Sequence, residues 1–165
     1  MSDKYFKKAL ADFTFDFASA DAIRLMAGKG LTVKEIQKRL DFPTPIDKIA
    51  EIVWKHYVDT GVILLEDPRN GTQKRFTYEK VQDGLGRVSF KQVVSKNTFS
   101  DKEFIPCDFG LKMLKDKKAF EKSLEELSGK DRDYILCLPW PPRIVWHEKN
   151  ERLSRIIKTL GGTEK

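Results

Sequence analysis

Two prolines, Pro43 and Pro45, lie two positions apart between two segments whose apolar residues recur at helical spacing. The residue before a proline is pushed away from helical dihedral angles, so a single helix cannot run through this stretch. Proline is nevertheless accepted as the first residue of a helix, because the N–H group that it lacks has no partner there. The sequence therefore predicts a pair of helices separated by a tight turn.

The helix before the turn has a defined start. Thr32 and Glu35 are spaced as a capping box, in which each side chain accepts a hydrogen bond from the backbone N–H of the other residue. Val33, Ile36 and Leu40 follow at helical spacing and form its expected inner face.

The helix after the turn is expected over residues 45–60, with Thr44 as its cap. Gly61 ends it, because glycine accepts the left-handed backbone conformation that closes many helices. We expect Trp54 on this helix to be largely buried. The apolar positions form one stripe, namely Ile46, Ile49, Ala50, Val53, Trp54, Tyr57 and Val58.

A third helix is expected upstream of the pair. Ser19 or Asp21 can cap it, and Gly28 and Gly30 can end it. The pattern of residues 1–18 suits either a helix or an extended arm, so both interpretations stay open.

A β-hairpin is expected directly downstream of the pair. Val62–Glu66 and Arg75–Val81 have the length and composition of strands. Asn70-Gly71 lies between them and is a strong signal for a hairpin turn.

These features together resemble the winged helix-turn-helix module of bacterial transcription regulators. Leu31–Ile46 looks like the helix-turn-helix pattern, with a capped helix, a tight turn holding one buried apolar residue (Phe42), and a second helix that opens on a small or polar residue. Val53–Ile63 is similar to the segment where the recognition helix passes into the wing. The resemblance covers residues 19–81. It leaves residues 1–18 as an N-terminal arm or helix, and residues 82–165 without a role.

The resemblance implies double-stranded DNA as the partner and transcription regulation as the function, with the helix over 45–60 inserted into the major groove. The residues that it places toward the bases are Thr44, Asp47, Lys48 and Glu51. The residues that it places toward the DNA backbone are Lys34, Lys38, Arg39, Arg69, Asn70, Lys74 and Arg75. Winged helices also serve as protein-docking modules, so the alternative is a protein–protein interaction module that acts as an adaptor.

Charge permits nucleic-acid binding without requiring it. The chain has 31 Lys and Arg against 25 Asp and Glu, a net charge of +6. Residues 18–81 hold 11 basic and 9 acidic side chains, whereas residues 82–165 hold 17 and 13. Asp47 and Glu51 also place two carboxylates on the expected reading face, where the phosphates would repel them. The basic surplus is therefore larger outside the helix-turn-helix segment.

The second half is expected to be a mixed region that gives the chain an α/β (α+β) fold. Its last helix could form a homodimer contact or pack on the chain's own core. We expect Trp140 to lie in the core within an extended, proline-rich connector. The expected elements are a turn at Asp83–Gly86, a strand at Arg87–Val94, a capping box at Ser100 and Glu103, helices at Phe109–Lys115 and Lys118–Leu127 with Ser128-Gly129 ending the second, a strand at Tyr134–Leu138 and a helix at Trp146–Leu160.

No motif in the chain points to enzymatic catalysis, a cofactor or a metal. The two cysteines and two histidines have no zinc-ligand spacing. Cys137 is expected to be inert in a buried strand, and Cys107 is expected to be the more exposed thiol. His56 is expected at the helix surface or its boundary. The absence of a signal peptide and of a long apolar run predicts a soluble, cytoplasmic protein without membrane contact.

Overall fold

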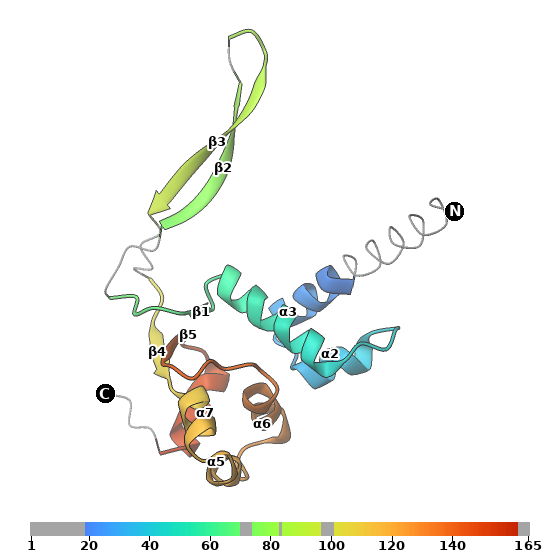
Figure 1. Cartoon of the computed structure of the whole chain (residues 1–165), viewed down its shortest axis with the longest axis vertical. Helices are drawn as coiled ribbons and strands as arrows, with labels where there is room; N and C mark the ends of the chain where they lie inside the picture. Colours follow the sequence, from blue (N-terminus) through green and yellow to red (C-terminus); the bar gives the residue numbers. More distant parts are fainter. Residues whose placement is uncertain (1–18, 70–73, 83, 97–100, 162–165) are drawn as a thin grey trace.

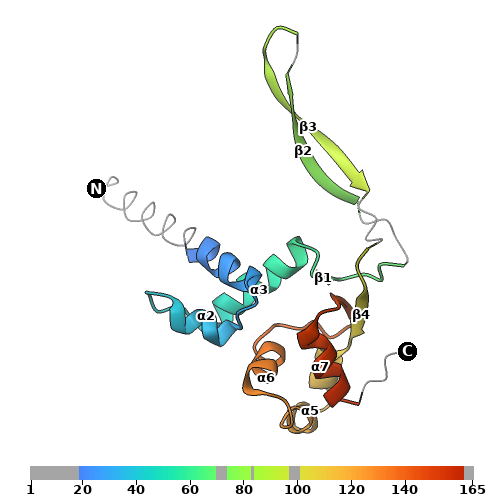
Figure 2. The same cartoon turned by 180° about the vertical axis from the view of Figure 1, so that it is seen from behind.

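The computed structural model describes residues 19–69, 74–82, 84–96 and 101–161, and within 74–96 it describes the side chains of 80–82, 84–89 and 91. Helices and small antiparallel sheets occur together, so the fold class is α+β. Figures 1 and 2 show the N-terminal helices beside a mainly helical C-terminal half, and a long two-stranded ribbon that projects from this body. The expected arm over 1–18 lies outside the described residues.

The predicted helix pair is present. α2 (Val33–Arg39) begins with the capping box: Glu35 N donates to the Thr32 hydroxyl at 3.3 Å, and Thr32 N donates to the Glu35 carboxylate at 2.9 Å. α3 (Ile46–Asp59) begins after Pro45, and no side chain caps it, so the cap expected from Thr44 is not formed. An upstream helix includes residues 19–28 and ends at Gly30, whose φ is +82°.

Ser19 and Asp21 do not cap this first helix, because residues 19 and 20 are already helical. Asp21 instead forms an exposed ion pair with Arg24 at 2.9 Å.

A left-handed glycine turns the chain from α3 into the sheet. Gly61 has a φ of +74°, and the N–H of Val62 donates to the carbonyl of Tyr57 at 2.9 Å. This pattern is a helix stop that satisfies carbonyls at the end of the helix. β1 (Ile63–Leu64) follows at once.

The predicted pairing of Val62–Glu66 with Arg75–Val81 in a hairpin is wrong. β1 pairs instead with β5 (Val145–Glu148), which also pairs with β4 (Phe104–Cys107), so the sheet order is β1-β5-β4. Both residues of β1 are buried, and such a strand needs a partner inside the body of the protein. The Asn70-Gly71 turn signal lies outside the described residues.

The segment expected as the return strand belongs to a different hairpin. β2 (Lys74–Gln82) pairs with β3 (Val88–Lys96) from Lys74 opposite Lys96 to Gln82 opposite Val88. Gly86, with a φ of +77°, lies in the turn that the sequence predicted at this place. Residue 81 therefore lies inside this ribbon.

The C-terminal half departs from prediction in three places. Tyr134–Leu138 is no strand: α6 (Gly129–Leu136) covers most of it, and Ser128 caps α6 rather than ending α5. Trp146 begins no helix, because β5 occupies 145–148 and α7 (Glu151–Thr159) starts after it. Glu103 opens no helix either, since β4 follows it.

The remaining helices lie close to their predicted positions. α4 (Phe109–Lys115) matches the prediction, and α5 (Lys117–Ser123) is shorter than expected. Gly110 of α4 lies against the backbone of Pro141, where a Cβ would come within 2.0 Å of the carbonyl oxygen. This close packing fixes α4 on the proline-rich connector.

A single hydrophobic core joins the two halves. Trp140 is buried, as predicted, and its indole N–H donates to the carbonyl of Ile135 at 2.8 Å. Trp54 of α3 contacts the Trp140 ring edge-on at 5.3 Å, but it is half-buried rather than largely buried, and it packs on the connector instead of a hairpin. Leu153 and Ile156 of α7 are fully buried, so the stripe expected as a possible dimer contact is used within the chain.

Candidate nucleic-acid interface

The surface to test is the outward side of α3. Ile49, Ala50, Val53 and Tyr57 are buried and form the inner side of this helix, as their spacing predicts. Four polar side chains occupy the opposite side and are all exposed, namely Asp47, Lys48, Glu51 and Lys55. The structure therefore presents three of the four predicted base-facing residues together along one face.

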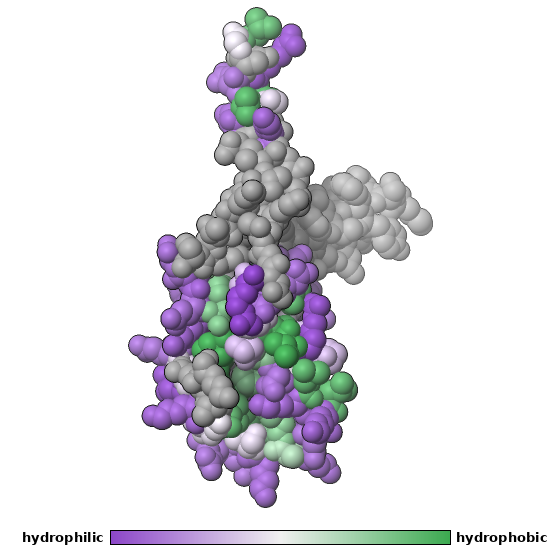
Figure 3. Space-filling view, turned by 90° about the vertical axis from the view of Figure 1, so that its left-hand side faces the viewer, coloured by the Kyte–Doolittle hydropathy of each residue, from purple (hydrophilic) through white to green (hydrophobic). Residues whose placement is uncertain are grey.

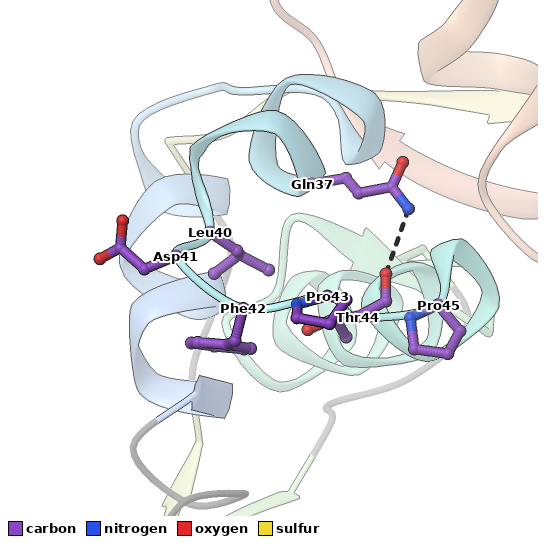
Figure 4. A pocket seen from close by; sticks show the side chains of 7 residues that line it. All are labelled: Gln37, Leu40, Asp41, Phe42, Pro43, Thr44 and Pro45. Atoms are coloured by element: carbon purple, nitrogen blue, oxygen red, sulfur yellow. Dashed lines mark hydrogen bonds between the residues drawn. The ribbon is translucent and has the colours of Figure 1, made fainter.

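The fourth predicted residue, Thr44, lies in the turn and is half-buried. Its carbonyl accepts a hydrogen bond from the Gln37 amide at 3.1 Å, which ties α2 to the start of α3 (Figure 4). Phe42 in the same turn is half-buried, not buried as expected. The turn lines an open pocket of about 450 Å³.

Two side chains that were predicted to contact the DNA backbone contact other side chains of the protein. The ammonium group of Lys34 lies 2.6 Å from the carboxylate of Asp133 on α6, and this hydrogen bond raises the pKa of Lys34. Arg69 pairs with Asp67 at 2.9 Å and stacks over the Trp146 ring at 4.9 Å. Sequence patterns near Lys34 and Arg69 do not show the distant partners Asp133 and Trp146, whereas Asp67 lies only two residues from Arg69.

A second ion pair ties α2 to α6. Lys130 lies 2.8 Å from Glu35, and together with the backbone N–H of Thr32 it lowers the pKa of Glu35 to about 2. The start of α2 is therefore fixed against the C-terminal half, while Lys38 and Arg39 at its other end are exposed.

The remaining predicted contacts lie at or near the ribbon. Lys74 and Arg75 open β2, and Asn70 lies outside the described residues. The span 74–96 holds six basic residues against Glu79 and Asp83, a net charge of +4 in a chain whose net charge is +6. Sequence reasoning divided this span at residue 81 and so missed its charge. The six basic residues are Lys74, Arg75, Lys80, Arg87, Lys91 and Lys96.

Both faces of the outer ribbon are exposed. Strand register places Gln82 and Val88 on one face and Val81 and Ser89 on the other, and all four side chains are exposed. Leu85 in the turn is 80% exposed. Figure 3 shows hydrophilic residues with a few hydrophobic ones along the described part of the ribbon.

The two cysteines and two histidines occupy different settings in the structure. Cys107, expected to be exposed, is buried, and desolvation raises the pKa of its thiol to about 12. Cys137 follows the end of α6 and is half-buried, so its predicted strand setting is wrong. His56 is half-buried, as expected for a residue at the boundary between the surface of α3 and the core. His147 is completely buried, and its Nε2 is hydrogen-bonded to the Tyr134 hydroxyl at 2.6 Å.

Within the described part of the chain, no group of three or more His, Cys, Asp or Glu residues is arranged to hold a metal ion. Over the same residues, no helix has the length and apolar character needed to cross a membrane. Comparison with known proteins finds no matching family model, no matching curated protein and no matching solved structure.

Proposed function

We propose that this protein binds double-stranded DNA, with α3 inserted into the major groove as in a helix-turn-helix regulator and with the β2–β3 ribbon as a second contact. The observation that carries the proposal is the exposed polar face of α3, which no other element covers within the described residues. Its 14 residues give a rod about 21 Å long, and the major groove is about 12 Å wide and accepts such a helix.

Each group of residues has a different role in this proposal. Lys48 and Glu51 lie where a recognition helix touches base edges, so they would contribute to sequence preference. Lys38 and Arg39 at the end of α2 are exposed cations suited to phosphate oxygens. Lys34 and Arg69 already hold partners, so we assign them no contact with DNA.

The charge distribution supports the ribbon as a second contact. A β-ribbon can enter a groove or follow the backbone, and phosphate neutralisation supplies most non-specific affinity. The span 74–96 has a net charge of +4, a large part of the +6 of the whole chain. The exposed Lys80, Arg87 and Lys91 place part of it on the outer half of the ribbon.

A protein-docking role for the same face is the second candidate. Asp47 and Glu51 alternate with Lys48 and Lys55 on α3, and a mixed charge pattern suits a complementary protein surface better than a row of phosphates. In this case the helix-turn-helix would serve as an adaptor.

The deciding experiment is binding of the full chain to mixed-sequence duplex DNA at low and moderate salt. We expect binding that weakens as salt rises, and a salt slope about one unit flatter for each phosphate contact removed. Lys38→Gln with Arg39→Gln should weaken binding to every duplex alike. Lys158→Gln, an exposed lysine of α7, is the matched control and should change nothing.

One further variant separates the candidates. Glu51→Gln removes repulsion from phosphates, so affinity for unrelated duplexes should rise while discrimination among sequences falls. Undetectable binding at low salt, or binding that none of these α2 and α3 substitutions alters, would overturn groove insertion and favour the adaptor role.

A further inference from the structure

A pocket of about 550 Å³ opens between the first helix, α3 and the start of α7. Residues 27–30 form one wall, His56 and Tyr57 form a second, and Asn150–Arg152 with Arg155 form a third. Its volume falls in the range of about 300 to 1,000 Å³ that small-molecule sites occupy. The pocket lies away from the exposed α3 face, because Tyr57 belongs to the buried side of that helix.

Positive charge predominates in the lining. Lys29, Arg152 and Arg155 are cationic, and Glu151 is the one carboxylate among the lining residues. His56 adds a ring nitrogen that can donate or accept a hydrogen bond. This composition favours an anionic ligand over a neutral or cationic one.

A buried carboxylate orients the two arginines. Asp131 is 5% exposed, and one of its oxygens lies 3.5 Å from both Arg152 Nε and Arg155 Nη2. A guanidinium group has five N–H donors, so sharing one oxygen leaves most donors of each arginine for a ligand. Planar donor pairs of this kind match carboxylate and phosphate oxygens.

Aromatic rings complete the pocket. The guanidinium of Arg152 lies over the Tyr134 ring at 5.0 Å, which holds it in place, and the Tyr57 and Tyr134 rings lie 6.2 Å apart. These rings and Val62 give the pocket an apolar side next to its charged side. The combination suits a molecule with an organic body and one anionic group.

We propose that this pocket binds a small organic anion, whose phosphate or carboxylate group contacts Arg152, Arg155 and Lys29 while its body rests against Tyr57 and Val62. The bound molecule bridges the helix-turn-helix to α7, because its contacts come from the first helix, α3 and α7 together. This assignment does not depend on DNA binding.

The test uses backbone amide NMR of the full chain, titrated with inorganic phosphate, citrate and adenosine monophosphate as probes. We expect saturable shifts at Lys29, His56 and Arg152 with at least one probe. Preference for phosphate or for citrate then identifies which oxyanion the pocket takes. Shifts that do not saturate, or that spread over exposed lysines elsewhere, overturn the proposal.

Substitutions locate the site. Arg155→Gln should weaken probe binding about tenfold without unfolding the protein, because this side chain is 60% exposed. Gly28→Phe keeps every charge but fills the pocket, and it should abolish binding. Lys158→Gln, on the same helix but outside the lining, is the control and should bind as the wild type does.

A short DNA duplex serves as the competing ligand. If the duplex shifts the same amides and displaces the small probes, the arginines contact DNA phosphates and the small-anion proposal is overturned. If probe and duplex bind together, the pocket is a separate site. Loss of DNA binding alone leaves the probe titrations unchanged, so the two proposals fail independently.

Discussion

His147 and Tyr134 form a buried polar pair whose proton positions follow from their partners. Nδ1 of His147 lies 2.7 Å from the carbonyl oxygen of Glu148, which can only accept, so Nδ1 carries the proton. Nε2 then accepts from the Tyr134 hydroxyl at 2.6 Å. Burial lowers the pKa of His147, because the charged ring would lose its hydration. The folded protein therefore holds this histidine neutral.

This state predicts a loss of stability in mild acid. An unfolded histidine has a pKa of about 6.5, and the folded value is lower, so the unfolded chain gains the proton first as pH falls. The free energy of unfolding should be fully retained above about pH 6.5 and should decline as pH falls through the folded pKa. Urea unfolding at several pH values between 7.5 and 5 measures this slope.

Three variants assign the slope to its source. His147→Gln should lose this part of the pH dependence, whereas His56→Gln should retain it. Tyr134→Phe keeps the histidine and its pH dependence but leaves Nε2 unpaired, at a cost of about 1 to 3 kcal/mol. Identical slopes for His147→Gln and the wild type would contradict the assignment.

At the scale of single elements, α2 is a short helix that relies on its start. Its seven residues are too few for an isolated helix to persist, so the capping box and the ion pairs to α6 carry much of its stability. Thr32→Ala removes the hydroxyl that accepts from Glu35 N and should cost about 1 kcal/mol of unfolding free energy. The urea midpoint should fall without a change in the denaturant slope.

The matched control for Thr32 is Thr60, another threonine at a helix end. Its hydroxyl bonds to the His56 carbonyl at an exposed site, so Thr60→Ala should cost less than about 0.5 kcal/mol. Equal losses for the two variants would mean that the capping box adds nothing specific.

Local signals explain which elements the sequence could predict. The cap at Thr32, the stripe on α3 and the stop at Gly61 each act within a few residues, and the structure confirms them except for Ile46 of the stripe, which is exposed. The strand predicted at Tyr134–Leu138 is wrong because a short apolar run fits a buried helix as well as a strand. The cap at Ser128 favours the helix. The partner of β1 lies far along the chain, so no local pattern could identify it.

The same distinction applies to the candidate site. The resemblance placed Asp47, Lys48 and Glu51 on one face of the helix, and they are exposed on α3 because the helical period sets them apart from its apolar stripe. The contact of Lys34 with Asp133 could not be predicted, because Asp133 lies 99 residues away and leaves no mark on the neighbouring sequence. The contact of Arg69 with the Trp146 ring could not be predicted for the same reason.

At the scale of the whole molecule, the described side chains of the ribbon contribute charge but no part of the hydrophobic core. Among the described residues, that core takes no member between 66 and 103. A two-stranded ribbon is marginally stable by itself, so contact of its exposed outer part with a partner would stabilise it.

Replacing residues 74–96 by a short glycine-serine linker tests whether the ribbon is needed for DNA binding but not for the stability of the rest of the protein. The melting temperature should change by no more than about 4 °C, because no described core contact is removed. Affinity for duplex DNA should fall, and its salt slope should flatten by several units. A shortened chain that unfolds would show that the ribbon supports the body, and one that binds DNA as before would exclude it from the interface.

The pairing of β1 with β5 sets the order in which this protein can fold as it is synthesised. The two strands lie about 80 residues apart, so β1 leaves the ribosome long before its partner exists. Until β5 emerges, the buried residues Ile63 and Leu64 of β1 lack the strand that pairs with them. The helix pair α2 and α3 and the strand β1 that follows it are thus made long before β5, and a nascent chain paused before Val145 would leave the apolar side chains of β1 without their partner strand.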